Sequence, residues 1–247
     1  MNHVAASGTG ALLSAEENHR LNMITISKEN YLKAVLEAES EGEHVISATL
    51  AHRLSVTAPA VTMALRRLKR DGLVSVRAEG RVELTAAGRE VALRTMMRHH
   101  LIERMLAEVF GMDWFQVHDE AERLEHAVSA EFEAKLAQKL GPAGVCPHGN
   151  PVVPERPEAR RKRGFRLLAE AEPGKSYRVC SVYERDTALL CFLDERGIRP
   201  GAKVRVLARN YDQTVTVISD KRKVFIGGPA AEKVWVERAD AGTPRSR

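Results

Sequence analysis

The chain has 247 residues, of which 44% are hydrophobic, so it can form one large domain or two to three small ones. Its formal net charge of +5 permits a nucleic-acid partner without requiring one. Its three cysteines make no even disulfide framework, and no apolar run approaches the roughly 20 residues of a membrane span. The N-terminal residues also lack the pattern of a secretory signal. Together these observations indicate a cytoplasmic protein with no membrane partner.

The first segment, residues 1–24, shows no sustained hydrophobic period and is predicted to be a disordered extension. Both Met1 and Met23 are compatible with being the true start. After this segment, apolar residues recur at helical spacing and predict a first helix, with Ser27 as its N-cap and Gly42 as its stop signal.

Three compact pieces follow this helix. Residues 46–56 predict a short amphipathic helix and a turn, and residues 57–72 predict a second helix, which Thr57 can cap. Residues 73–85 alternate apolar and polar positions, which is typical of a two-stranded hairpin. Helix, turn, helix and hairpin in this order predict a winged helix-turn-helix DNA-binding domain over residues 25–92.

The helix over residues 57–72 is the candidate reader of DNA, because a helix fits the major groove and presents its N-terminal residues to base edges. The residues expected at base edges are Thr57, Ala58, Pro59, Thr62 and Met63. The residues expected at phosphates, from this helix and the hairpin, are Arg66, Arg67, Arg77 and Arg81. The alternative is an amphipathic helix that buries Val61, Leu65 and Leu68 and merely carries charge on its outer face.

Residues 86–140 are predicted to form long helices with a break at Ser129. They carry more apolar surface than a winged helix needs. We therefore expect these helices to pair in a homodimer. With the candidate metal ligands described next, residues 93–150 are predicted to be a helical dimerisation and metal-binding domain.

Candidate metal ligands lie on these helices. One helix face, at positions i, i+4, i+7 and i+8, carries His118, Glu122, Glu125 and His126. On the preceding helix, His99 and Glu103 are again four residues apart. Packed side by side, the two helices would bring nitrogen and oxygen ligands together in a set that suits Mn, Fe or Zn. The alternative is that histidine and glutamate are simply common on solvated helix faces.

Residues 151–174 are rich in proline and glycine and are predicted to be loop and linker, with the basic run 160–163 either solvated or in contact with phosphate. Short β-rich runs then fill residues 175–240, with one helix-like piece among them. The expected fold class is mainly α with a small β domain: an N-terminal winged helix-turn-helix, a helical dimerisation domain and a small C-terminal barrel.

From about residue 27 to residue 238, the chain resembles the DtxR/MntR family of metal-dependent transcriptional repressors. The most specific segments are ENYLKAV, TAPAVTMALRRLKRDGLV, HHLIERML, VHDEAERLEH and CPHGNPVVP. The tail, with DTALLCFLDERGIRPGAKVRV and IGGPAAEKVWV, is similar to the FeoA or SH3-like barrel of that family. The resemblance implies a homodimer that binds a palindromic operator on double-stranded DNA when a divalent metal is present. It also implies control of metal-uptake or homeostasis genes and no small-molecule substrate.

The resemblance further implies where metal binds. The main site would use Glu122, Glu125 and His126, with Asn30 from the first helix. A second site would use His99, Glu103 and His118. In some members the cysteine and histidine of the CPHG loop and an acid of the third domain also bind metal. Here these would be Cys146, His148 and Asp186, with Glu184 as the rival of Asp186, unless Cys146 and His148 only shape a tight turn.

Two positions bear on the identity of the metal. Iron-sensing members place a cysteine where this chain has Glu122, and a hard carboxylate suits Mn(II), so manganese is expected, with Fe(II) or Zn(II) sensing left open. Asn30 departs from the methionine or aspartate usual in the family, so Glu29 or a water could replace it. Met63 stands where iron-sensing members have glutamine, so a different operator preference is expected.

Other functions are also compatible with these residues. A di-metal hydrolase could use the histidine and glutamate cluster, but the chain has no separate nucleophile motif and the winged helix would then have no role, so we expect no enzymatic activity. A winged-helix protein with a structural metal site would still bind DNA after chelation. In the favoured mechanism, metal joins the first helix to the dimer helices and thereby sets the spacing of the DNA-binding heads.

Overall fold

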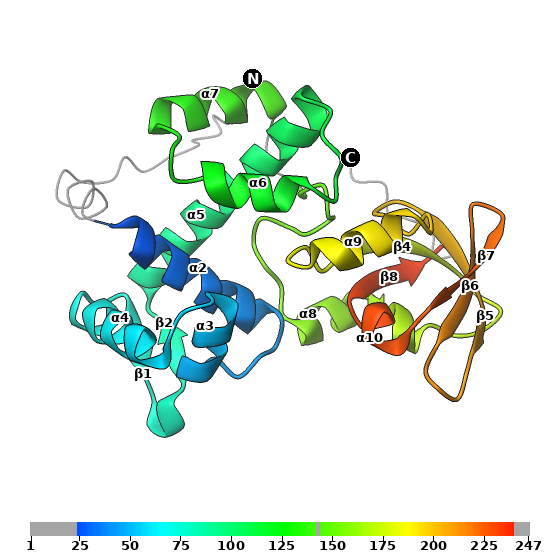
Figure 1. Ribbon diagram of the computed structural model, residues 1–247, viewed down its shortest axis with the longest axis horizontal. Helices are drawn as coiled ribbons and strands as arrows, with labels where there is room; N and C mark the ends of the chain where they lie inside the picture. The colour runs from blue at the N-terminus through cyan, green and yellow to red at the C-terminus, as the bar shows by residue number, and fades with distance from the viewer. Residues whose placement is uncertain (1–23, 142–143, 240–247) are drawn as a thin grey trace, which may run out of the picture.

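The computed structural model describes residues 24–141 and 144–239. A winged-helix domain, a group of helices and a β-sheet domain follow one another along the chain, and the sheet domain lies at one end of the molecule (Figure 1). The expected disordered extension, and with it the choice between Met1 and Met23, falls on residues outside the described ranges. Among the described helices, none combines the length and the apolar character needed to cross a bilayer.

The winged-helix domain contains three helices and an antiparallel hairpin. Its elements are α2 (Ile26–Ser40), α3 (Ser47–Arg53), α4 (Ala58–Arg70), β1 (Val74–Val76), η1 (Ala78–Gly80) and β2 (Val82–Leu84). Thr57 begins α4 as predicted, because its hydroxyl accepts a hydrogen bond from the Ala60 amide. The prediction for the first helix was wrong by two residues: Thr25, not Ser27, is the N-cap of α2, since it accepts from the Lys28 amide.

The second part is helical. Its elements are α5 (Ala86–Arg104), the π-helical turn η2 (Met105–Val109), α6 (Val117–Leu124) and α7 (Ala130–Leu140). The predicted break is confirmed, because Ser129 caps α7 by accepting from the Phe132 amide. Helix α6 ends at Leu124, so Glu125 and His126 stand in the turn after it rather than on a continuous helix face. Helix α5 packs against both α2 and α6, which brings the ligand-bearing segments together.

The third part is a six-stranded antiparallel sheet in the order β3-β8-β4-β5-β6-β7. Its strands are β3 (Arg166–Leu167), β4 (Ser176–Val182), β5 (Lys203–Arg209), β6 (Val215–Ser219), β7 (Arg222–Ile226) and β8 (Val234–Arg238). Its helical elements are η3 (Leu168–Glu170), α9 (Thr187–Asp194) and α10 (Gly228–Ala231). The β-rich runs and the helix-like piece predicted after residue 175 are present, and their inward faces form one apolar core.

The segment 151–174 holds more structure than the predicted loop and linker. Helix α8 (Pro157–Lys162) begins with Pro157, whose fixed backbone angle suits a first turn. Strand β3 pairs with β8, which places Arg166 opposite Val236. The proline and glycine content of this segment is typical of loops and indicates neither element. Strand β3 could not be predicted from local sequence, because its partner strand lies far along the chain.

Candidate metal centres and DNA-binding face

The first candidate centre is the α2–α6 junction, formed by Glu29, Lys33, Glu122, Glu125 and His126. Ring nitrogen Nδ1 of His126 lies 2.8 Å from Glu29 Oε2, and Nε2 lies 3.2 Å from Glu125 Oε1. Glu125 is fully buried although it follows the last helical residue of α6. The structure therefore brings together the three main-site ligands expected from α6 and the turn after it with an acid from α2.

Lys33 was not among the sequence-based candidates, yet it lies at the centre of this junction. Its Nζ donates to Glu122 Oε1 at 2.7 Å and to both carboxylate oxygens of Glu125 at 2.9 and 2.8 Å. The side chain is only 3% exposed. Its position three residues after Asn30, on the same face of α2, is the signal that could have indicated it.

The charges in the junction stabilise one another. Burial alone lowers the pKa of Lys33, but the carboxylates of Glu125, Glu37 and Glu122 outweigh burial and raise it. Burial in turn raises the pKa of Glu125, while hydrogen bonds from His126 and His99 and the charge of Lys33 lower it far below its usual range. The ammonium and the carboxylates are therefore ionised at neutral pH.

The second candidate centre, the histidine pair, is formed by His99, Glu103 and His118 and is buried. His99 Nε2 lies 3.1 Å from Glu103 Oε1 and 3.1 Å from His118 Nδ1, and His118 Nδ1 lies 3.2 Å from the same carboxylate oxygen. Burial and Lys33 lower the pKa of His99, but Glu103 and Glu125 raise it, to about 10. Metal binding to this pair requires unprotonated ring nitrogens and therefore competes with protons.

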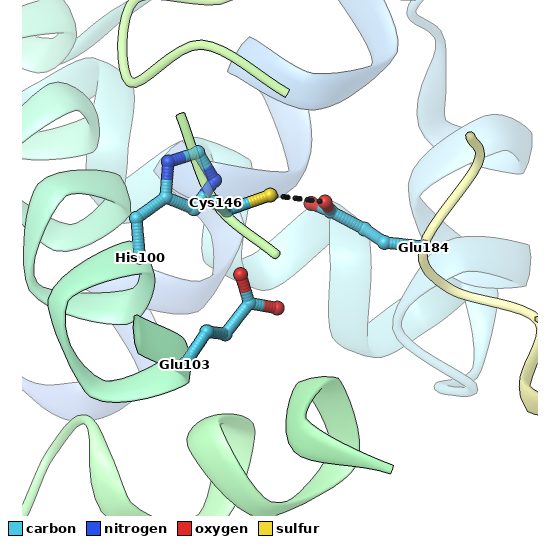
Figure 2. A group of neighbouring side chains, drawn as sticks. All are labelled: His100, Glu103, Cys146 and Glu184. Atoms are coloured by element: carbon cyan, nitrogen blue, oxygen red, sulfur yellow. Dashed lines mark hydrogen bonds between the residues drawn. The ribbon is translucent and has the colours of Figure 1, made fainter. Parts of the chain in front are cut away.

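The third candidate centre, the loop cluster, joins α5 to the CPHG loop and to the end of β4 (Figure 2). The residues that can offer ligand atoms within 4.8 Å of one another are His100, Glu103, Cys146 and Glu184. Cys146 Sγ lies 3.3 Å from Glu184 Oε2, and His148 Nδ1 lies 3.6 Å from the same oxygen. His148 Nδ1 is also 3.4 Å from Glu103 Oε1, so Glu103 is shared between the loop cluster and the histidine pair.

The loop cluster depends on a close backbone contact. Gly149 has a φ of 81°, and a Cβ at this residue would lie 1.9 Å from the Cys180 carbonyl oxygen of β4. Only glycine combines this conformation with this approach. The CPHG turn is therefore both a tight turn and the means by which Cys146 and His148 reach Glu184.

Among the expected ligands, Asp186 is not brought to any centre. Its carboxylate accepts from the Leu189 amide as the N-cap of α9 and pairs with Lys233 Nζ at 3.3 Å. Glu184, the rival candidate, supplies the acid from the third domain instead. The reason is geometric, because Glu184 leaves the end of β4 toward Cys146 whereas Asp186 already belongs to the start of α9.

The donor set fits a divalent metal ion. Several buried polar atoms have no hydrogen-bond partner, and burying such an atom unpaired costs about 1–3 kcal/mol. They include Asn30 Oδ1, Glu103 Oε2, His148 Nε2 and both ring nitrogens of His100. His100 was not predicted as a ligand from the sequence, because its neighbour His99 is the residue that lies four positions before Glu103. A bound cation would satisfy lone pairs that the protein itself leaves unpaired.

Arg185 connects the loop cluster to the winged helix. It directly follows Glu184, and its guanidinium lies 2.5 Å from Glu37 Oε2 of α2 and donates to the Arg53 carbonyl of α3 at 3.1 Å. Glu37 is nearly buried. The third domain therefore holds the end of α2 directly, next to a candidate metal ligand.

The candidate DNA face is exposed on the winged-helix domain. Val61, Leu65 and Leu68 are buried, as predicted for the inner face of α4. All nine candidate contact residues are exposed: Thr57, Ala58, Pro59, Thr62, Met63, Arg66, Arg67, Arg77 and Arg81. In the hairpin, Arg77 and Arg81 both pair with Glu83, at 2.8 and 3.5 Å, which partly neutralises them.

An exposed recognition helix joined to buried clusters of histidine, carboxylate and thiol defines a metal-responsive DNA-binding regulator. Comparison with family models agrees in each part of the chain. Residues 23–82 match the N-terminal DNA-binding domain of iron-dependent repressors, residues 85–154 match their metal-binding and dimerisation domain, and residues 166–238 match the FeoA domain. The chain belongs to the iron-dependent repressor family, whose members are metal-dependent, DNA-binding transcriptional repressors and not enzymes.

Relatives and solved structures cover nearly the whole described chain. The diphtheria toxin repressor of Corynebacterium glutamicum is 40% identical over 221 residues, which is 86% of this chain and 96% of that protein. The iron-dependent repressor IdeR of Mycobacterium tuberculosis is 31% identical over 229 residues, covering 88% and 100% of the two chains. A manganese-dependent transcriptional repressor in complex with manganese aligns with a TM-score of 0.76 at 34% identity, covering 85% and 99%. These findings confirm the expected family and fold, with a divalent metal, DNA and a second copy of the chain as partners.

Proposed function

We propose that the protein is a Mn(II)-responsive repressor that binds a palindromic operator as a homodimer and controls metal-uptake or homeostasis genes in the cytoplasm. The observation that carries the metal assignment is the carboxylate of Glu122 beside Glu125 and His126. Hard oxygen donors with one imidazole suit Mn(II). Similarity to a repressor solved with manganese supports the same assignment.

Fe(II) or Zn(II) is the second candidate, and one observation favours it. The loop cluster contains the thiol of Cys146, and thiolates prefer softer ions. Burial and the nearby Glu184 and Glu103 raise the pKa of this thiol, so it binds as a thiolate only where a cation offsets those charges. The curated relatives described as iron-dependent are consistent with this alternative.

The chain's own residues supply the coupling to DNA. Glu122, Glu125 and His126 hold the α6 side of the junction, and Asn30 and Glu29 hold the α2 side. The bound ion supplies positive charge that offsets the carboxylates. Because α2 is packed against the recognition helix α4, its position relative to α6 sets the orientation of the DNA-binding head.

The dimer would pair the helical parts. Exposed apolar side chains occur on α5, η2 and α7 and in the turn after η2, namely Met97, Val109, Phe110 and Phe132, with Phe110 67% exposed. Such apolar exposure on a helical surface is typical of a protein interface. Two heads related by the dimer axis would match two operator half-sites.

A metal titration of DNA binding tests the proposal. Duplexes selected from a random pool by the Mn(II)-loaded protein would be titrated at fixed salt with Mn(II), Fe(II), Co(II) and Zn(II), because salt alone shifts such affinities strongly. We expect Mn(II) to tighten binding most, and Glu122→Ala with His126→Ala to remove that effect. Glu120→Ala is the matched control, since the partner of Glu120 among the described residues is the exposed Arg123 on the same helix. Equal affinity with and without metal in all variants would refute metal gating.

A further inference from the structure

The position of Lys33 has a consequence for metal binding in the α2–α6 junction. Every polar contact of its ammonium is with a candidate metal ligand: three carboxylate oxygens of Glu122 and Glu125 at 2.7 to 2.9 Å, and His99 Nδ1 at 3.4 Å. These atoms come from α5, α6 and the turn after α6, whereas Lys33 comes from α2. The ammonium therefore sits where ligands from three segments converge, which is a place suited to a cation.

A metal ion cannot share this place with Lys33. A lysine ammonium is a compact point charge, and a divalent ion chelated by the same three oxygens would lie at contact distance from a like charge in a low-dielectric environment. The side chain is 3% exposed, so the ammonium is not free to turn into solvent without opening the packing between α2 and α5. Glu125, whose side chain is fully buried, also requires a positive partner at all times.

The part of the junction around His126 is suited to an ion. There His126 Nδ1 lies 2.8 Å from Glu29 Oε2, and Nε2 lies 3.2 Å from Glu125 Oε1, an oxygen that the Lys33 ammonium also contacts at 2.9 Å. Asn30, one turn before Lys33 on α2, has a buried Oδ1 with no hydrogen-bond partner. The junction thus has two parts, one filled by the ammonium and one, around His126, where potential ligand atoms have no hydrogen-bond partner.

We propose that Lys33 is a tethered cation that permanently fills the His99 side of the α2–α6 junction, so that the junction accepts at most one metal ion and α2 is linked to α6 even in the metal-free protein. This inference rests on the proposed metal site at Glu122, Glu125 and His126. It adds a residue that determines how many ions that site holds.

The test measures metal content and stability without DNA. Full-length wild type, Lys33→Glu and Lys33→Met are stripped with chelator, dialysed against Mn(II), and analysed for manganese per protomer. Lys33→Glu removes the ammonium and adds a carboxylate, so we expect about one additional Mn(II) per protomer relative to wild type. Lys28→Met is the matched control: Lys28 lies on the same helix and pairs with Asp71 at 3.0 Å at the surface, so its Mn(II) count stays that of wild type.

The melting temperature of the chelated proteins is the second measurement. Lys33→Met leaves the fully buried Glu125 with histidine partners alone. We expect this change to lower the melting temperature by on the order of 10 °C, and Mn(II) to restore more of the loss than it adds to wild type. An unchanged Mn(II) count in Lys33→Glu, or an unchanged melting temperature in chelated Lys33→Met, overturns the inference. If Lys33→Glu does not fold, the melting and Mn(II) rescue of Lys33→Met decide. Metal-gated DNA binding that persists alongside either negative result would leave the proposed function intact, so the two failures are distinguishable.

Discussion

Arg185→Ala tests whether the contact between the third domain and the winged helix transmits metal binding to DNA. In the structure this guanidinium pairs with the nearly buried Glu37 at 2.5 Å and donates to the Arg53 carbonyl at 3.1 Å. Hydrogen bonds involving charged groups each contribute about 1.5–3 kcal/mol. The two contacts share one guanidinium, so their contributions are not additive, and Glu37 keeps a second partner, because Arg53 lies 4.0 Å away. We therefore expect the combined loss to be about 2 kcal/mol.

This magnitude sets an upper limit on the effect on DNA affinity. A contact shifts an equilibrium between two arrangements only by the difference it makes between them. If the contact forms fully only in the DNA-binding arrangement, about 2 kcal/mol corresponds to roughly 30-fold weaker binding by the Mn(II)-loaded protein. The assay is a DNA titration at fixed salt with saturating Mn(II), read by fluorescence anisotropy.

The matched control is Arg166→Ala, which removes an arginine–glutamate pair, with Glu172 at 3.0 Å, that lies wholly within the third domain. We expect the control to bind DNA like wild type. Arg185→Lys should recover part of the loss, because a lysine can still pair with Glu37 but lacks the second donor for the carbonyl of Arg53. Wild-type affinity in Arg185→Ala would show that the third domain does not orient the head through this contact.

Three other predictions concern the loop cluster and the DNA face. Glu184→Gln should weaken metal binding by about 10- to 100-fold. Asp186→Ala should leave metal affinity unchanged and lower the free energy of unfolding by about 1 kcal/mol, because a helix cap is lost. Calorimetric metal titration and thermal melting separate the two variants, and the reverse pattern would exclude Glu184 as the ligand. Gly149→Ala should displace the CPHG loop, because the new Cβ meets the Cys180 carbonyl at 1.9 Å, and therefore lower the metal count measured by elemental analysis; an unchanged count would contradict the role of this approach. Arg66→Ala should weaken binding to all DNA sequences alike and reduce the slope of log affinity against log salt by about 1, and a change confined to particular bases would show direct base contact instead.

Local patterns in the sequence were sufficient for most of the architecture. The N-cap at Thr57, the break at Ser129 and the β-rich runs after residue 175 were all predicted correctly, because each depends on hydrogen bonds or side-chain alternation among residues close along the chain. Segments carrying His99, Glu122 and His126 were recognisable for the same reason, since their spacing is helical.

Tertiary packing decided the rest. Strand β3 exists only through pairing with β8, and α8 was hidden in a segment of loop-like composition. The choice of Glu184 over Asp186 depended on how the chain leaves β4, which no local pattern records. Lys33 meets Glu122 and Glu125 from 89 and 92 residues away, so its role as a buried cation became visible only when α2 was placed against α6. Hydrogen-bonded caps and strand alternation are local properties, whereas the convergence of charges on one buried point depends on the packing of distant helices.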